Sequence, residues 1–73
     1  MSDAVLKALG KVIQEKANAK YKSKLEFAYA CDIDEKSIRR ILKGEQNFSL
    51  HVFLKISSAL GVKMSDLLLE VNS

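Results

Sequence analysis

The sequence predicts an all-α fold, and three observations support this prediction. Proline is absent and glycine occurs only three times in 73 residues, which disfavours the many turns of a strand-rich domain. Apolar residues recur at the three- and four-residue spacing of amphipathic helices. Residues that start or stop helices lie between these apolar segments, at Ser23, Asp34, Gly44, Ser49 and Gly61. We therefore expect one compact domain of five helices over residues 1–73, with its core in about 4–69.

The first predicted helix runs from about Asp3 to Asn18. Gly10 lies inside it and weakens it slightly, because glycine has a low helix propensity. Residues 19–22 are polar and are expected to connect it to the next helix. The apolar residues at helical spacing are Val5, Leu6, Leu9, Val12, Ile13 and Ala17.

The second predicted helix is short and begins with a capping box. Ser23 and Glu26 have the required spacing, so that each side chain satisfies a free backbone N–H group at the helix start. The helix is expected to end near Ala30 or Cys31.

A third helix is predicted from Glu35 to Lys43. Asp34 is its N-cap, and Ile33 and Ile38 flank that cap at the spacing of a hydrophobic staple. Gly44 follows the last turn and supplies the left-handed residue that commonly ends a helix.

Two more helices complete the prediction. Ser49 caps the fourth, and Phe48 and Phe53 have the staple spacing across that cap. This helix is expected to end at Gly61. Ser65 is expected to cap a last short helix over residues 66–71. The carboxylate of Asp66, in its first turn, interacts favourably with the positive end of the helix dipole.

The second and third predicted helices have the pattern of a helix-turn-helix. Ala28 is small where the two helices approach each other, and Asp32 tolerates the positive φ that the turn requires. A compact helical hairpin in a small bundle is the alternative, but the agreement of apolar, small and turn positions favours the helix-turn-helix. The inward positions, all of them apolar, are Phe27, Cys31, Ile33, Ile38 and Ile41.

Positive charge is concentrated in this region. The formal net charge is +3, and residues 20–43 contain seven basic and four acidic residues, so the whole excess lies there. A localised basic face indicates a polyanionic partner.

Several segments together resemble the lambda-repressor-like family of helix-turn-helix DNA-binding proteins, also called XRE-type or Cro/repressor-type. They are residues 23–28, 33–41, Gly44 and 49–62, and the resemblance extends over nearly the whole chain. The run from Phe53 to Leu68 lies outside the helix-turn-helix and is among the more specific matches. The sequence departs from the usual family pattern at Lys24, Asp32, Leu42, Glu45 and Phe48.

The resemblance implies that the third helix lies in the major groove of double-stranded DNA. It assigns base reading to Glu35, Lys36 and Arg40, because lysine and arginine donate to guanine and a carboxylate accepts from cytosine N4. The alternative for each is a solvated charge on a helix surface. Contacts to the DNA backbone are expected from Lys24, Leu25, Ser37, Arg39, Lys43, Gln46 and Asn47.

Other classes of protein are disfavoured. The lone Cys31 forms no internal disulfide, no apolar run approaches the roughly 20 residues of a membrane span, and the acidic N-terminus does not match a signal peptide. We expect a cytoplasmic protein. His51 has no partner at metal-ligand spacing, and nucleophile–base pairs and phosphate-binding glycine loops are missing. We therefore expect no enzyme activity, no cofactor and no metal.

The function expected from the sequence is transcription regulation, as a repressor or controller bound to a pseudo-palindromic operator. One such module reads few base pairs, so a homodimer is expected, with Leu69 and Val71 at its interface. The C-terminal segment has more apolar residues than one short helix can bury. The alternative is that Leu67 and Leu68 close the core. The alternative function is that of an antitoxin or adapter whose main partner is another protein, such as a toxin.

Overall fold

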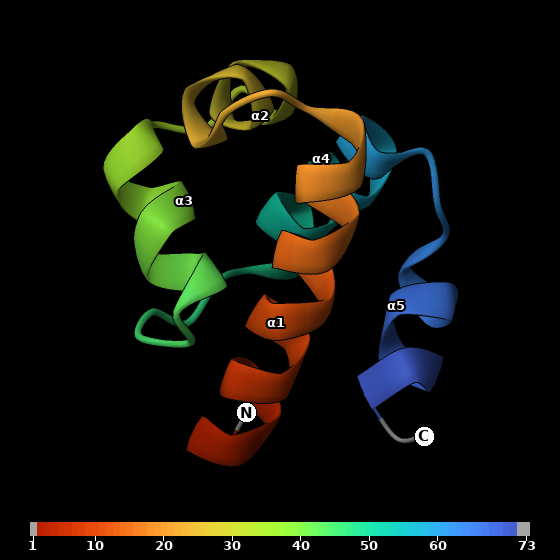
Figure 1. Cartoon of the computed structure of the whole chain (residues 1–73). Coiled ribbons are helices and arrows are strands. Elements are labelled where there is room, and N and C mark those ends of the chain that lie inside the picture. The colour runs from red at the N-terminus through yellow and green to blue at the C-terminus, as the bar shows by residue number, and fades with distance from the viewer. Residues whose placement is uncertain (1, 72–73) are drawn as a thin grey trace.

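The computed structural model describes residues 2–71, and in this range the chain forms helices and no strand (Figure 1). The all-α prediction is therefore confirmed. Within the described range, no helix has the length and apolar character needed to cross a membrane. The helices are α1 (Asp3–Lys20), α2 (Lys24–Cys31), α3 (Glu35–Leu42), α4 (Leu50–Leu60) and α5 (Met64–Val71).

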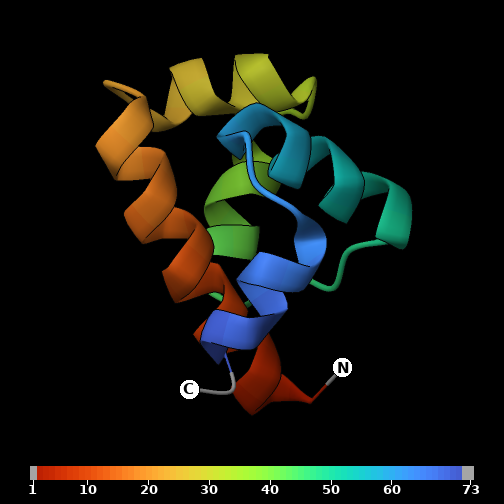
Figure 2. The same cartoon turned by 90° about the vertical axis from the view of Figure 1, so that its right-hand side faces the viewer.

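The longest helix, α1, organises the packing of the others. It contacts α3 on one side and α5 on the other, while α2 packs against both α3 and α4. Figure 1 shows α3 and α5 on opposite sides of α1, and the turned view in Figure 2 shows α5 crossing beside α4. Helices α2 and α3 are thus held as a pair at one side of the molecule.

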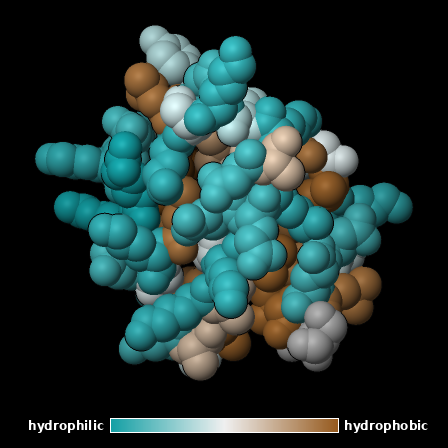
Figure 3. Space-filling model, viewed as in Figure 1, coloured by the Kyte–Doolittle hydropathy of each residue, from teal (hydrophilic) through white to brown (hydrophobic). Residues whose placement is uncertain are grey.

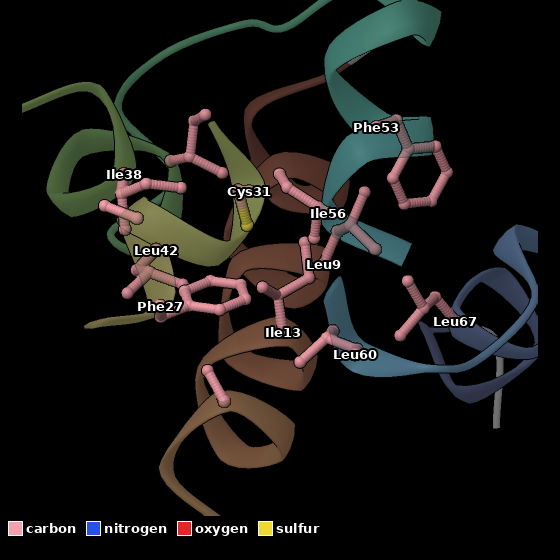
Figure 4. Close-up of a cluster of buried hydrophobic side chains, with 13 residues drawn as sticks. Leu9, Ile13, Phe27, Cys31, Ile38, Leu42, Phe53, Ile56, Leu60 and Leu67 are labelled. Carbon is pink, nitrogen blue, oxygen red and sulfur yellow. The ribbon is translucent and has the colours of Figure 1, made fainter. Parts of the chain in front are cut away.

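The core is built from the apolar faces of all five helices (Figure 4). Of the inward positions expected in the helix-turn-helix, all are buried except Ile33, which is half-buried and packs on the core. Leu42 is also buried, at 5% exposure, although the sequence analysis did not count it as inward. Each fully buried large apolar side chain contributes about 1.5–3 kcal/mol. The buried set at the α2–α3 pair is Phe27, Ala28, Cys31, Ile38, Ile41 and Leu42.

The caps predicted for α2 and α4 form. Ser23 Oγ accepts the Glu26 N–H at 3.1 Å, but the Glu26 carboxylate accepts the N–H of Lys22, at 3.0 Å, one residue before the expected one. The predicted staple at α4 is confirmed, since the rings of Phe48 and Phe53 lie 5.7 Å apart between centroids.

Helix α3 ends at Leu42, one residue before the predicted Lys43, which is its C-cap. Two further boundaries differ from the prediction. Ser65 is not an N-cap, because α5 begins one residue earlier, at Met64, whose side chain packs partly buried on the core. The carbonyl of Lys63 starts this helix by accepting the Asp66 N–H at 3.0 Å. Helix α1 extends two residues beyond the expected end, and the N–H of Tyr21 still bonds into its last turn. At both boundaries, packing and backbone hydrogen bonds extend the helix into residues that were expected to lie outside it.

Gly10 allows the backbones of α1 and α3 to touch. A Cβ atom at this position would lie 2.6 Å from the carbonyl oxygen of Ile41 and 2.7 Å from that of Leu42. Gly44 has a φ of 73°, as predicted, and a Cβ there would lie 2.6 Å from Cα of Lys7. Gly10, which was expected only to weaken α1, is therefore the residue against which the C-terminal end of α3 packs.

Candidate nucleic-acid interface

The turn between α2 and α3 is fixed by Asp32. This residue has φ 57° and ψ 45°, the left-handed conformation that the sequence predicted for it. The next N–H, from Ile33, donates to the carbonyl of Ala28 at 3.1 Å. Lys55 of α4 lies 3.7 Å from the Asp32 carboxylate and donates to its carbonyl at 3.5 Å, a tie that sequence spacing did not reveal. The angle between α2 and α3 is thus set by local backbone bonds and by α4.

The exposed face of α3 follows from which of its residues are buried. Ile38 and Ile41 have exposures of 0% and 1%, so the residues on the opposite side of the helix point outward. Hydrophilic side chains cover and project from the side of the molecule where α3 lies (Figure 3). The exposed basic residues on this helix and at its end are Lys36, Arg39, Arg40 and Lys43.

The N-terminus of α3 carries a charged cap. The Asp34 carboxylate accepts the Ser37 N–H at 2.9 Å, and this bond holds the pKa of Asp34 below its ordinary value. The cap is therefore ionised at neutral pH and satisfies one of the free N–H groups of the first turn. Ser37 is half-buried and lies at one edge of the exposed face.

Glu35 and Arg39 form an ion pair along the other edge of this face. Arg39 Nη2 lies 2.8 Å from Glu35 Oε2, which is a hydrogen-bonded pair four residues apart on one helix. The sequence analysis treated the two residues separately, although an acid followed by a base at this spacing is a familiar helix pair. Among the described residues, Lys36 and Arg40 have no carboxylate within ion-pair distance.

Of the residues expected to contact the DNA backbone, Ser37 and Arg39 lie within α3, and the others come before or after it in the chain. Helix geometry leaves the N–H groups of Lys24 and Leu25 without acceptors in their own helix, at the positive end of the α2 dipole. Lys24 is half-buried and Leu25 is exposed. After α3, Gln46 is half-buried and Asn47 is exposed in the loop that leads to α4. Along the chain, these groups come before and after the basic residues of α3.

The two residues expected at a dimer interface differ in exposure. Leu69 is 67% exposed, whereas Val71 is half-buried and packs on the chain's own core. Leu67 is fully buried and Leu68 is 42% exposed. Leu67 therefore closes the core, while hydrophobic atoms remain at the surface near α5 (Figure 3).

Cys31 and His51 have no place in this surface. Burial raises the pKa of the Cys31 thiol to about 11, so it stays protonated and packs as a small apolar group. His51 is exposed near the start of α4. Residues 2–71 contain no group of three side chains placed to hold a metal ion.

Two short helices joined by a tight turn, with one face buried and the other basic, define a DNA-binding helix-turn-helix protein. Residues 13–67 match the model of the helix-turn-helix family. The chain belongs to this family, in its lambda-repressor-like, XRE-type form.

Solved structures show the same fold. The restriction-modification controller protein C.AhdI from Aeromonas hydrophila is 27% identical, with a TM-score of 0.81 over 85% of this chain and 94% of that chain. The clp gene regulator ClgR from C. glutamicum is 22% identical, with a TM-score of 0.84 over 93% of this chain and 88% of that one. A comparison with curated protein sequences found no match.

Proposed function

We propose that this chain is a transcription repressor or controller that acts in the cytoplasm and binds a pseudo-palindromic operator as a homodimer. The proposal depends mainly on one observation: Lys36 and Arg40 are exposed on α3, directly opposite the buried Ile38 and Ile41. The similarity to a restriction-modification controller protein supports a regulatory role of this kind.

Lys36 and Arg40 are the proposed base readers. Both project from the exposed face of the helix that enters the major groove, and neither has an ion-pair partner among the described residues. Lysine and arginine donate to the O6 and N7 acceptors of guanine, and a good contact discriminates by about 1–3 kcal/mol. Their competing role, as solvated surface charges, would give no base preference.

Backbone contacts are proposed at both ends of α3. The N–H groups of Lys24 and Leu25 meet a phosphate at the start of α2, with the Lys24 ammonium beside them. On the other side, Lys43, Gln46 and Asn47 contact the backbone. Ser37, at the edge of the reading face, is a further donor to phosphate.

The homodimer is proposed to form through the exposed part of α5. Leu69 is two-thirds exposed beside the partly exposed Leu68, and the half-buried Val71 borders them. A two-fold axis at this surface would place the two copies of α3 about 34 Å apart, which is one turn of DNA. Leu69→Glu is expected to shift the protein to monomer in sedimentation velocity, and an unchanged dimer would contradict this interface.

A gel-shift titration with Lys36→Ala and Lys24→Ala tests the division between base and backbone contacts. Lys36→Ala should relax base preference, whereas Lys24→Ala should weaken binding to all sequences alike. Equal losses on a selected duplex and on random DNA for both variants would contradict these roles. Binding that does not weaken between low and moderate salt would contradict DNA as the partner.

A protein-binding role, as an antitoxin or adapter, is the second candidate. It is favoured by Leu50 and Leu54, which are 72% and 51% exposed and lie one turn apart on α4. The basic residues of α3 argue against an adapter that has no DNA target. A toxin-binding role would be supported if Leu50→Glu abolished binding of a co-expressed toxin while DNA binding remained unchanged.

A further inference from the structure

The ion pair between Glu35 and Arg39 distinguishes one arginine of the reading helix from the others. The two side chains are 36% and 55% exposed, and their charged atoms are 2.8 Å apart. Lys36 and Arg40 have no carboxylate within ion-pair distance among the described residues, although the charge of Arg40 contributes to lowering the pKa of Asp34. Among the described basic residues of this face, Arg39 is the one whose guanidinium is hydrogen-bonded to a neighbouring carboxylate.

A pair this exposed contributes little to folding stability, so its main effect is on orientation. Side chains on a helix point back toward its N-terminus. Arg39 accordingly reaches back one turn to Glu35, the first residue of α3. In this class of protein the N-terminal part of α3 is the part that reaches base edges.

The guanidinium retains enough donors to bind a base. It has five N–H groups in a rigid plane, and the hydrogen bond to Glu35 involves only Nη2. Two of the remaining donors can meet the O6 and N7 acceptors of guanine together. Because the carboxylate fixes the plane of the group beforehand, less side-chain entropy is lost on binding.

We propose that Glu35 is a positioning residue that holds Arg39 for one guanine of the operator. This inference rests on the proposed function, and it gives both residues roles other than those expected from the sequence. Glu35 contacts Arg39 instead of cytosine, and Arg39 reads a base instead of contacting phosphate. The carboxylate also repels nearby phosphates, so Glu35 lowers affinity for all DNA while raising selectivity.

The test uses two duplexes and the full chain. One duplex is selected by the wild-type protein from a library with a randomised centre, and the other is its scrambled version. Dissociation constants are measured for wild type, Glu35→Gln, Arg39→Ala, Arg39→Lys and the double variant Glu35→Gln/Arg39→Ala. Circular dichroism confirms that each variant is folded.

Loss of Glu35 is expected to reduce the preference for the selected duplex by about tenfold, while affinity for the scrambled duplex stays equal or rises. Arg39→Ala should lose the preference at the same G·C pair. The double variant should lose no more preference than Arg39→Ala alone. Arg39→Lys should also lose it, because lysine keeps the charge but not the planar fork.

Glu45→Gln is the matched control. It removes an exposed acid from the loop after α3, and among the described residues Glu45 has no ion-pair partner. This variant should raise affinity for both duplexes alike and leave the preference unchanged. An unchanged preference in Glu35→Gln as well would show that Glu35 only repels DNA, and would overturn the proposal.

One other outcome would also overturn this inference. If Glu35→Gln reduced the preference further in the Arg39→Ala background, Glu35 would be contacting a base itself. In these cases the wild type would still select a duplex, so the proposed function would stand. If the wild type selected no duplex at all, the proposed function would fail together with this inference.

Discussion

The two faces of α3 are controlled by different partners. Its inner face is fixed by atoms of the same chain, since Ile38 is fully buried and the helix end rests on the backbone at Gly10. Its outer face carries charged side chains, of which Glu35 and Arg39 form an ion pair with each other. One helix therefore combines a face that determines stability with a face that is free to determine binding. The difference predicts that mutations on the two faces have separable effects.

The largest expected effect is on the inner face. Ile38→Ala removes a fully buried side chain and should lower the free energy of unfolding by about 3 kcal/mol, measured by urea denaturation. Leu50→Ala is the control, because its side chain is 72% exposed and its loss should cost no more than about 0.5 kcal/mol. Similar costs for the two variants would mean that the inner face does not determine stability.

The close packing of α3 against the backbone of α1 can be tested by substituting Gly10. Gly10→Ala should lower the free energy of unfolding by about 1–2 kcal/mol, because overpacking against backbone outweighs the better helix propensity. Gly61→Ala is the comparison variant. It introduces strain at φ +71°, worth about 1 kcal/mol, but its Cβ meets only the flexible end of Lys20, at 3.4 Å.

The two glycine variants should differ in DNA binding as well as in stability. Gly10→Ala displaces α3 and is expected to weaken selective binding, whereas Gly61→Ala should leave selectivity unchanged. Equal selectivity in the two variants, measured by gel shift, would show that the contact at Gly10 does not position α3.

The cap at the N-terminus of α3 should give stability a pH dependence. The pKa of Asp34 is lowered in the folded state, so its contribution is present above the unfolded pKa and is lost as the pH falls below about 4. Asp34→Asn keeps a capping side chain that does not ionise. Between about pH 7 and about pH 3, the urea midpoint of wild type should fall more than that of Asp34→Asn. If the urea midpoints of the two proteins fell equally, ionisation of Asp34 would not contribute to stability.

The smallest expected effect is on the outer face. Lys36→Ala should change the free energy of unfolding by no more than about 0.5 kcal/mol, because the side chain is exposed and has no ion-pair partner among residues 2–71. Urea denaturation without DNA measures this. A loss as large as that of Ile38→Ala would remove the distinction between the two faces.

Apolar spacing and cap residues were sufficient to predict the inner face. Ile38 and Ile41 were expected inside and are buried, and Asp32 has the positive φ expected of the turn. These features follow from local chemistry and helical periodicity. The burial of Leu42 was not predicted, because this position was treated only as a departure from the family pattern, whereas its own apolar character is the better guide to its burial.

The features that could not be predicted depend on contacts between distant segments. Gly10 contacts the backbone of Ile41, which lies more than thirty positions later in the chain. No local pattern therefore distinguishes this glycine from one that only weakens a helix. The contact between Lys55 and Asp32 could not be predicted for the same reason, because the two residues are far apart in the sequence. Ser65 was wrongly placed as a cap because burial of Met64 outweighs the local capping signal. The outer face stays a prediction, because its roles depend on a DNA molecule.

The backbone contact at Gly10 has a practical consequence for changing the DNA target of this protein. Main-chain atoms at Gly10, together with the buried side chains of α3, set how far this helix stands from the body of the molecule. A library that randomises the outer positions Lys36, Arg39 and Arg40 would therefore sample new operators on a constant scaffold. Such a library should retain glycine at positions 10 and 44, since a larger residue there would move every reading side chain at once.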